Sequence, residues 1–292
     1  MNEQKIKFAY FGGEPLGVPV LEALRQAGLL PSLIVSNPDR PVGRKQTLTP
    51  PPVKVWAELN NVEVWQPQTI PKTPSDLGRI TSEEWDVFIV VAYNKILPEW
   101  FIELPKHKTL NVHPSLLPKL RGASPIRSTI LNDMRTECGV SVMLLDEHMD
   151  HGPIIAQERM EIPQEVWPVS GTELDEALAR LGGAVLADIL PQWVAGLLKS
   201  EEQDHEAATY CGKMTKDMAE LTIDPYHLPK GALAYEQLLK IRAFDGWPVA
   251  FFIHEGKRYK ITAATIGDEG KLQIDRVIPE GKNETDFKAI FR

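Results

Sequence analysis

The first part of the chain alternates short apolar runs with segments whose apolar residues recur at helical spacing. Apolar runs bounded by glycine or polar turns fall at residues 5–13, 31–36 and 85–93. Residues 18–30 and 53–59 instead place apolar side chains three or four positions apart, as amphipathic helices do. The run at 85–93 is apolar on both faces, which is typical of a central parallel strand. The alternation predicts an open, mostly parallel α/β sheet.

The later part of the chain has a different pattern. Two more strands are predicted at residues 138–146 and 152–162, and residues 171–199 have the periodicity of a helix. A polar stretch at 199–209 is typical of a linker. Beyond it the pattern predicts one helix and three short strands, at residues 231–244, 249–254, 257–265 and 271–278. These strands indicate a small β-barrel or sandwich as a second domain.

Composition narrows the class of protein. The 292 residues carry a formal net charge of −8, and this excess acidity lies before His205, because Lys and Arg balance Asp and Glu after it. Such a charge argues against a protein that coats nucleic acid without sequence preference. A polyanionic ligand would have to bind at local basic patches. No apolar stretch is long enough to cross a membrane. Cys138 and Cys211 lack the spacing of a metal site or a disulfide framework, which predicts reduced thiols in a cytoplasmic protein.

A polar pair stands at the end of one predicted strand, in the stretch "LNVHPSLLPKLRGASP". Asn111 and His113 share one face of this strand because side chains alternate, and Val112 faces the other way. Open α/β sheets bind ligands at the carboxyl ends of their parallel strands. An amide donor beside a histidine suits an oxygen that becomes negative in a transition state. The alternative is a histidine whose ring is satisfied by loop carbonyls.

A second polar turn, "LLDEHMDHGPII", lies between two apolar runs. Asp150 in this turn can reach the same crevice, orient His113 and accept a proton. The other polar residues of the turn are predicted to be solvent-exposed, at Asp146, Glu147, His148 and His151. The two turn histidines do not lie on a helix, so no zinc site is predicted and the chemistry requires no metal.

Other features support alternative hypotheses. The loop "FGGEPLG" follows the first strand, and its glycines are equally compatible with tight packing and with substrate contact. Its glycine order is not a dinucleotide fingerprint, although Asp39 stands where a ribose-binding acid would. Cys138 is predicted to be a packed thiol, and no serine nucleophile motif occurs. Without a nucleophile, we expect direct transfer between two bound substrates.

These segments resemble a known family. "NVHPSLLPKLRGASPI" and "TECGVSVMLLDEHMDHGPIIAQ" resemble the signature of the 10-formyltetrahydrofolate-dependent formyltransferases. Within that group, "SNPDRPVGRKQTLTPPPVKVWA" and "KIRAFDGWPVAFF" are similar to the methionyl-tRNA formyltransferases. The resemblance implies a Rossmann-like catalytic domain at residues 1–204 and an OB-like β-barrel domain at residues 205–292. It also implies direct formyl transfer from 10-formyltetrahydrofolate to methionine on initiator tRNA, through a tetrahedral intermediate, in translation initiation. We predict no metal ion, membrane or stable protein partner.

The resemblance also implies roles for individual residues. Asn111 and protonated His113 would hold the formyl oxygen while the amine attacks, and Asp150 would orient His113 and help to remove the amine's proton. The implied folate contacts are Ile96, Leu97, Ser115, Leu116, Leu117, Pro118 and Asp146. The implied contacts to methionyl-tRNA are Gly13, Pro15, Arg40, Arg44 and Lys45. The last three lie in a loop at residues 37–52 that is rich in Pro and Arg.

Two other functions stay open at this point. A formyltransferase acting on the amine of a sugar nucleotide would use the same donor and the same three catalytic residues, but no tRNA. A dinucleotide-binding oxidoreductase or a binding module would explain the glycine loop and Asp39, but not Asn111, His113 and Asp150. The chain departs from the family pattern at Leu16-Gly17, where relatives carry an aromatic residue, and at Asn94, which replaces an expected glycine.

Overall fold

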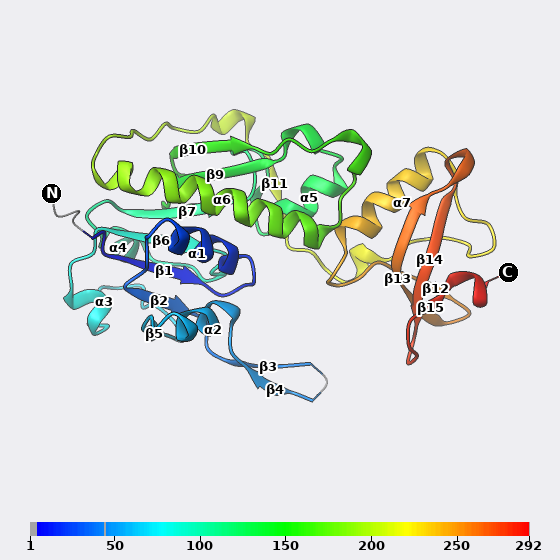
Figure 1. Cartoon of the computed structure of the whole chain (residues 1–292), viewed down its shortest axis with the longest axis horizontal. Coiled ribbons are helices and arrows are strands. Elements are labelled where there is room, and N and C mark those ends of the chain that lie inside the picture. The colour runs from blue at the N-terminus through cyan, green and yellow to red at the C-terminus, as the bar shows by residue number, and fades with distance from the viewer. Residues whose placement is uncertain (1–4, 44, 292) are drawn as a thin grey trace. The chain divides into compact units, whose positions relative to one another are not determined.

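The computed structural model describes residues 5–43 and 45–291, which form two compact units (Figure 1). The first unit consists of three stretches of chain, which run up to Arg121, over Gly139–Met160 and over Glu176–Thr209. The second unit also consists of three stretches, which are Gly122–Cys138, Glu161–Asp175 and the chain from Tyr210 onward. Two segments that precede the polar stretch at 199–209 therefore pack with the C-terminal part. The predicted boundary between residues 204 and 205 stays a prediction.

The first unit is built on a seven-stranded sheet with the order β10-β9-β7-β6-β1-β2-β5. Five neighbouring strands are parallel, namely β1 (Phe8–Gly12), β2 (Leu33–Ser36), β5 (Val64–Trp65), β6 (Val87–Val91) and β7 (Thr109–His113). Two strands at one edge pair antiparallel, namely β9 (Gly139–Leu144) and β10 (Ile154–Arg159). The predicted open, mostly parallel sheet is confirmed. Because β1 lies between β2 and β6, the strand order reverses there, and such sheets bind ligands at that reversal.

Helices cover both faces of this sheet because successive strand residues point to opposite sides. Phe8 and Tyr10 of β1 belong to one apolar core, whereas Ala9 and Phe11 belong to another. The first core also takes residues from three helices, α1 (Gly17–Gln26), α2 (Pro52–Leu59) and α6 (Gly171–Val194). The second core takes residues from two short helices, α3 (Arg79–Ser82) and α4 (Glu99–Ile102). The sheet is therefore the middle of three layers (Figure 1).

Helix α6 ends earlier than the predicted helix at residues 171–199, for a local reason. Gly196 has a φ of +70°, in the left-handed region that glycine enters at little steric cost. The N–H groups of Gly196 and Leu197 donate to the carbonyls of Trp193 and Gln192 at 3.0 and 2.9 Å. This pair of hydrogen bonds satisfies carbonyls of the last turn and turns the chain away from the helix axis.

The Pro- and Arg-rich segment at residues 37–52 was predicted to be a loop, but it contains two short strands. Strand β3 (Arg40–Val42) pairs antiparallel with β4 (Thr47–Thr49), and the residues of both strands are exposed. The prediction of a loop was wrong. Proline at position 41 argues against a strand in general, but both strands of a two-stranded hairpin are edge strands, and edge strands tolerate proline. Arg44 lies outside the described residues.

The second unit packs helices against an antiparallel sheet. Its helices are α5 (Pro125–Leu131) and α7 (Ala232–Ala243). Its sheet contains, in spatial order, β12 (Phe251–His254), β13 (Lys257–Ile266), β14 (Leu272–Pro279) and β15 (Thr285–Asp286). A separate two-stranded pair consists of β8 (Arg121–Gly122), whose first residue belongs to the first unit, and β11 (Tyr210–Cys211). The predicted C-terminal helix and three strands are confirmed, and β15 adds a fourth strand. Among the described residues, no helix combines the length and apolar composition needed to span a membrane.

Candidate active site

Asn111 and His113 lie at the carboxyl end of β7, on the face opposite to the apolar Leu110 and Val112. Their side chains are nearly enclosed, because Asn111 is 8% and His113 is 5% exposed. Neighbouring strands hold them in register, with Asn111 beside Val90 of β6 and His113 beside Ser141 of β9. The predicted common face is confirmed, and it places two polar donors in a nearly buried environment.

The two ring nitrogens of His113 have different surroundings. Nε2 lies 3.0 Å from the carbonyl oxygen of Leu120, and because a carbonyl only accepts, this nitrogen carries a hydrogen. Nδ1 lies 3.6 Å from Oδ1 of Asp150, which is within ion-pair range but longer than a hydrogen bond. A protonated Nδ1 can therefore donate to a substrate oxygen while Asp150 stabilises the positive charge on the ring.

Asp150 is held by the backbone of the turn between β9 and β10. Its φ is +51°, a left-handed conformation that asparagine and aspartate tolerate better than most residues. Gly152 follows it in close contact with the sheet, since a Cβ there would lie 2.2 Å from the carbonyl oxygen of Leu144. The turn is thus shaped by local backbone requirements, and these direct the Asp150 carboxylate toward His113.

A buried polar network supports this turn from another part of the chain. The Gln203 side chain, 5% exposed, donates from Nε2 to the carbonyls of Asp150 and Gly152 at 3.0 and 2.7 Å. Its Oε1 accepts from Nε and Nη2 of Arg121 at 3.0 and 2.7 Å, and Arg121 is 1% exposed. Nη2 of Arg121 also donates to Nδ1 of His205 at 2.9 Å. Sequence reasoning missed Gln203 because it lies in a polar stretch that reads as a solvated linker.

The loop that follows β7 is fixed by side chains of the two edge strands. Ser141 of β9 donates from Oγ to the Ser115 carbonyl at 2.7 Å and accepts from the Leu117 N–H at 3.0 Å. Gln157 of β10 donates to the Leu117 carbonyl at 2.8 Å. Ser115 and Leu117 are buried, whereas Leu116 and Pro118 are half-buried. Ser141 alternates with apolar neighbours, whereas Gln157 precedes two charged residues, and neither pattern identifies the loop that these side chains hold.

The glycine loop after β1 packs against the ends of β2 and β6. A Cβ on Gly13 would lie 2.1 Å from Nδ2 of Asn37, so a larger residue cannot replace this glycine without movement. Asn37 in turn donates to the Tyr93 carbonyl at 3.1 Å. Asn94, which stands where the family pattern has glycine, has a φ of +59°. Tight packing thus accounts for Gly13, and Asn94 keeps the conformation that a glycine would take.

The carboxylate of Asp39 already forms hydrogen bonds with side chains of the same unit. Lys54 lies 2.9 Å from both carboxylate oxygens, and Gln66 donates to Oδ1 at 2.8 Å. These bonds, that of Gln66 foremost, lower the pKa of the Asp39 carboxyl below its usual value. A carboxylate so engaged braces β2 against α2, which removes the main support for a ribose-binding acid.

The remaining predicted contact residues have varied surroundings. Ile96 is 94% exposed, and Leu97 packs partly against the second core. Pro15, Arg40 and Lys45 are exposed, and Arg40 lies 3.6 Å from the carboxylate of Glu14. Exposure leaves these side chains available to a ligand, and their contacts stay predictions.

The turn histidines differ from each other, contrary to the prediction that both are exposed. The His148 side chain is 64% exposed, but that of His151 is 34% exposed. His151 Nδ1 lies 2.7 Å from Oδ2 of Asp146, and its ring stacks on His205 at 4.0 Å. His205 is distant in sequence, so the burial of His151 could not be read from the local turn.

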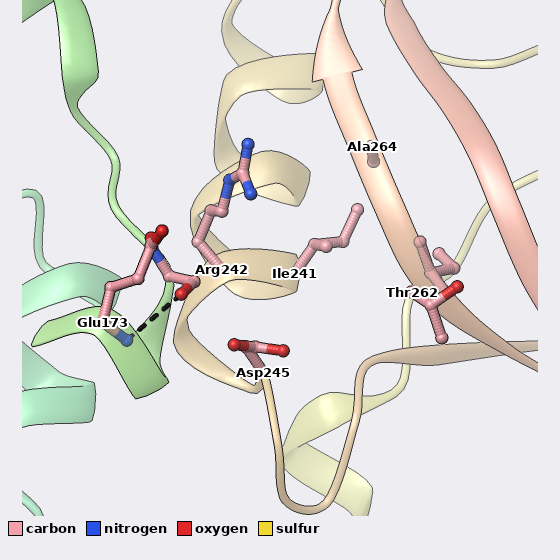
Figure 2. A pocket seen from close by; sticks show the side chains of 8 residues that line it. Glu173, Ile241, Arg242, Asp245, Thr262 and Ala264 are labelled. Atoms are coloured by element: carbon pink, nitrogen blue, oxygen red, sulfur yellow. Dashed lines mark hydrogen bonds between the residues drawn. The ribbon is translucent and has the colours of Figure 1, made fainter. Parts of the chain in front are cut away.

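A cavity of about 220 Å³ belongs to the second unit (Figure 2). It is lined by Ser170, Glu173, Ile241, Arg242, Asp245, Ile261, Thr262 and Ala264. Two carboxylates and one guanidinium therefore border the same space, and the nearby Ser170 and Arg242 lower the pKa of Glu173. None of the predicted site residues lines this cavity, so the cavity is not part of the candidate active site at β7.

The amino-acid sequence matches the family model described as formyl transferase over residues 4–189. The chain belongs to the formyl transferase family. This formyl transferase is 38% identical over 262 residues to the methionyl-tRNA formyltransferase of Listeria innocua serovar 6a, which covers 90% of this chain and 80% of that relative. Family membership confirms the resemblance and counts against a dinucleotide-dependent oxidoreductase.

Solved structures share the fold of this formyl transferase. An N-formyltransferase from Helicobacter canadensis has a TM-score of 0.65 at 18% identity, and the match covers 94% of this chain and all of that one. Methionyl-tRNA formyltransferase from Clostridium thermocellum has a TM-score of 0.58 at 14% identity, covering 94% and 98% of the two chains. At these identities the likeness concerns the fold alone.

Proposed function

We propose that the protein transfers a formyl group from 10-formyltetrahydrofolate to the amino group of methionine carried by initiator tRNA. Support comes from the 38% identity to a methionyl-tRNA formyltransferase over 90% of the chain. The observation that carries the chemistry is the buried pair Asn111 and His113, with Asp150 3.6 Å from the His113 ring. These groups suit acyl transfer, since they offer two donors and one acceptor at largely buried positions.

In the proposed reaction the amine nitrogen attacks the formyl carbon, and the carbonyl becomes an oxyanion in a tetrahedral intermediate. Asn111 donates from its amide, and His113 donates from protonated Nδ1, to this oxygen. Asp150 balances the imidazolium and accepts the amine's proton, directly or through water. The bond between the formyl carbon and the folate nitrogen then breaks, and that nitrogen takes up a proton. No side chain forms a covalent bond to the formyl group.

The folate is proposed to lie along the loop Ser115–Pro118, near Ile96, Leu97 and Asp146. Support comes from the way this loop is held: bonds from Ser141 and Gln157 fix its backbone at the end of β7. A fixed loop presents main-chain donors and acceptors at constant positions, which suits recognition of a pterin ring.

The tRNA is proposed to contact the β3–β4 hairpin through Arg40 and Lys45, and also through Arg44, which lies outside the described residues. Exposed cations on a narrow hairpin can reach phosphates that a compact surface cannot. Gly13 and Pro15 are proposed to border the methionine side. We further propose that the antiparallel sheet of the second unit is OB-like and adds a share of the tRNA affinity.

A sugar-nucleotide amine is the second candidate acceptor, favoured by one observation. The Helicobacter canadensis structure, described as a complex with folinic acid and dTDP-3-aminofucose, has a TM-score of 0.65 to this chain. The two acceptors can be separated with labelled 10-formyltetrahydrofolate and purified protein. We expect label on charged initiator tRNA and none on amino-sugar nucleotides; the reverse pattern would replace the proposed acceptor.

The catalytic roles can be tested by substitution. We expect Asn111→Ala and His113→Ala each to lower turnover on the order of 100-fold or more, with much smaller changes in folate affinity, because the lost bonds form in the transition state. Asp150→Asn should also abolish most turnover, since it removes the charge and keeps the shape. Asn60→Ala, an amide loss at the end of α2, is the matched control. Near-normal turnover in a folded Asn111 or His113 variant would refute these roles.

A further inference from the structure

Three metal-binding side chains gather in the turn between β9 and β10. One ligand atom from each of Asp146, His148 and His151 lies within 4.8 Å of the other two. Among the described residues this is the only such group of His, Cys, Asp and Glu side chains. Asp146 organises it, because its Oδ1 accepts from the backbone N–H of His148 at 2.9 Å and its Oδ2 lies 2.7 Å from His151 Nδ1.

Although the sequence of this turn predicted no zinc site, we propose that Asp146, His148 and His151 bind one divalent transition-metal ion of the Zn²⁺ class, with water completing the coordination. Two imidazoles and a carboxylate suit such borderline ions, whereas Mg²⁺ and Ca²⁺ prefer oxygen ligands alone. Bonds of about 2.1 Å allow ligand atoms to be at most about 4.2 Å apart. The ligand atoms of the turn, which lie within 4.8 Å of one another, are close to that limit, and rotation of the exposed His148 side chain can bring them within it. The metal takes the position of the proton that Asp146 and His151 share.

The three ligands differ in mobility in a way that suits capture of an ion. His151 is held on its ring face by His205, whose ring is parallel to it within 4°, and this contact remains when the metal replaces the hydrogen bond between His151 and Asp146. Arg121 in turn fixes His205 through Nδ1 at 2.9 Å. His148 is the most exposed of the three, at 64%, with the His151 ring at 5.0 Å and the Glu147 carboxylate at 3.9 Å beside its own ring, so its side chain can rotate to close the site. Supporting contacts of this kind orient metal ligands in proteins.

The proposed metal site lies in the turn that carries Asp150, and Asp150 stands between His148 and His151 in the sequence. A bound ion cross-links residues 146, 148 and 151, so it restrains the backbone on both sides of Asp150. We therefore expect the amide protons of residues 147–152 to exchange more slowly with solvent when the metal is present. The binding proposal rests on the ligand geometry alone, and because Asp146 is also a proposed folate contact, the metal is titrated without folate.

Binding can be measured by titrating the full chain with Zn²⁺ in a calorimeter and with Co²⁺ in a spectrophotometer. We expect one ion per chain, and a loss of affinity of about tenfold or more in His148→Ala and in Asp146→Asn. His148→Ala should fold normally because the side chain is exposed. His227→Ala is the matched control: its Nδ1 also lies 2.7 Å from an aspartate, Asp224, but no third ligand joins that pair among the described residues.

The titrations and the amide exchange together decide whether the ion binds at this turn. Saturable one-to-one binding that weakens in His148→Ala and Asp146→Asn, and not in His227→Ala, supports the site. Absence of saturable binding in wild type, or binding that survives both turn substitutions, overturns it and leaves Asp146 as a hydrogen-bonding brace of the turn. Unchanged amide exchange at residues 147–152 despite binding would place the ion elsewhere.

Discussion

Replacing Gln203 with leucine tests whether a distant amide holds the turn of Asp150. The substitution keeps the volume of the side chain and removes four hydrogen bonds at once. Two of them involve the charged Arg121, where a bond is worth about 1.5–3 kcal/mol, and two reach backbone carbonyls, where it is worth about 0.5–1.5 kcal/mol. Because the four bonds share one amide and water can re-enter, their values do not add fully, and we expect a loss of about 3 kcal/mol.

The assay is urea unfolding of wild type, Gln203→Leu and the control Gln26→Leu, with amide exchange of residues 146–152 as a local readout. Gln26 is exposed at the end of α1, so its substitution should change the free energy of unfolding by no more than about 0.5 kcal/mol. In Gln203→Leu, turnover should fall more than folate affinity, since the proposed base Asp150 moves while the loop Ser115–Pro118, which supplies four of the seven proposed folate contacts, stays fixed. A Gln203→Leu unfolding free energy equal to that of the control would show that the network does not stabilise the turn.

Two other predictions concern the surface of the first unit. Folding lowers the Asp39 pKa, so its contribution to stability is present above the unfolded pKa of about 4 and disappears as pH falls through the folded value. Wild type should therefore be more stable than Asp39→Asn at pH 7 and lose that advantage in acid, as urea unfolding at both pH values can check; a pH-independent difference would contradict this. Lys45→Ala should weaken tRNA binding, reduce its salt slope by about one and spare folate binding. An unaltered slope in filter-binding titrations would exclude a phosphate contact by Lys45.

The sequence determined the features that depend on local periodicity. Alternation along residues 109–113 placed Asn111 and His113 on one face, and the structure confirms that face because neighbouring strands impose a two-residue repeat. The apolar runs likewise predicted the parallel strands and the helices between them. Such patterns can be read from sequence because each strand or helix must bury one side regardless of its partners.

Only the tertiary structure decided which distant segments support the site. Gln203 lies about fifty residues from Asp150 in a stretch whose polarity indicates a solvated linker, yet it is buried beneath the turn. His151 is half-buried because His205 stacks on it, and the turn sequence alone predicted exposure. A polar residue looks the same in sequence whether water or a buried carbonyl satisfies it. The difference arises when the chain packs, since burial then forces every polar group to find a partner within the protein.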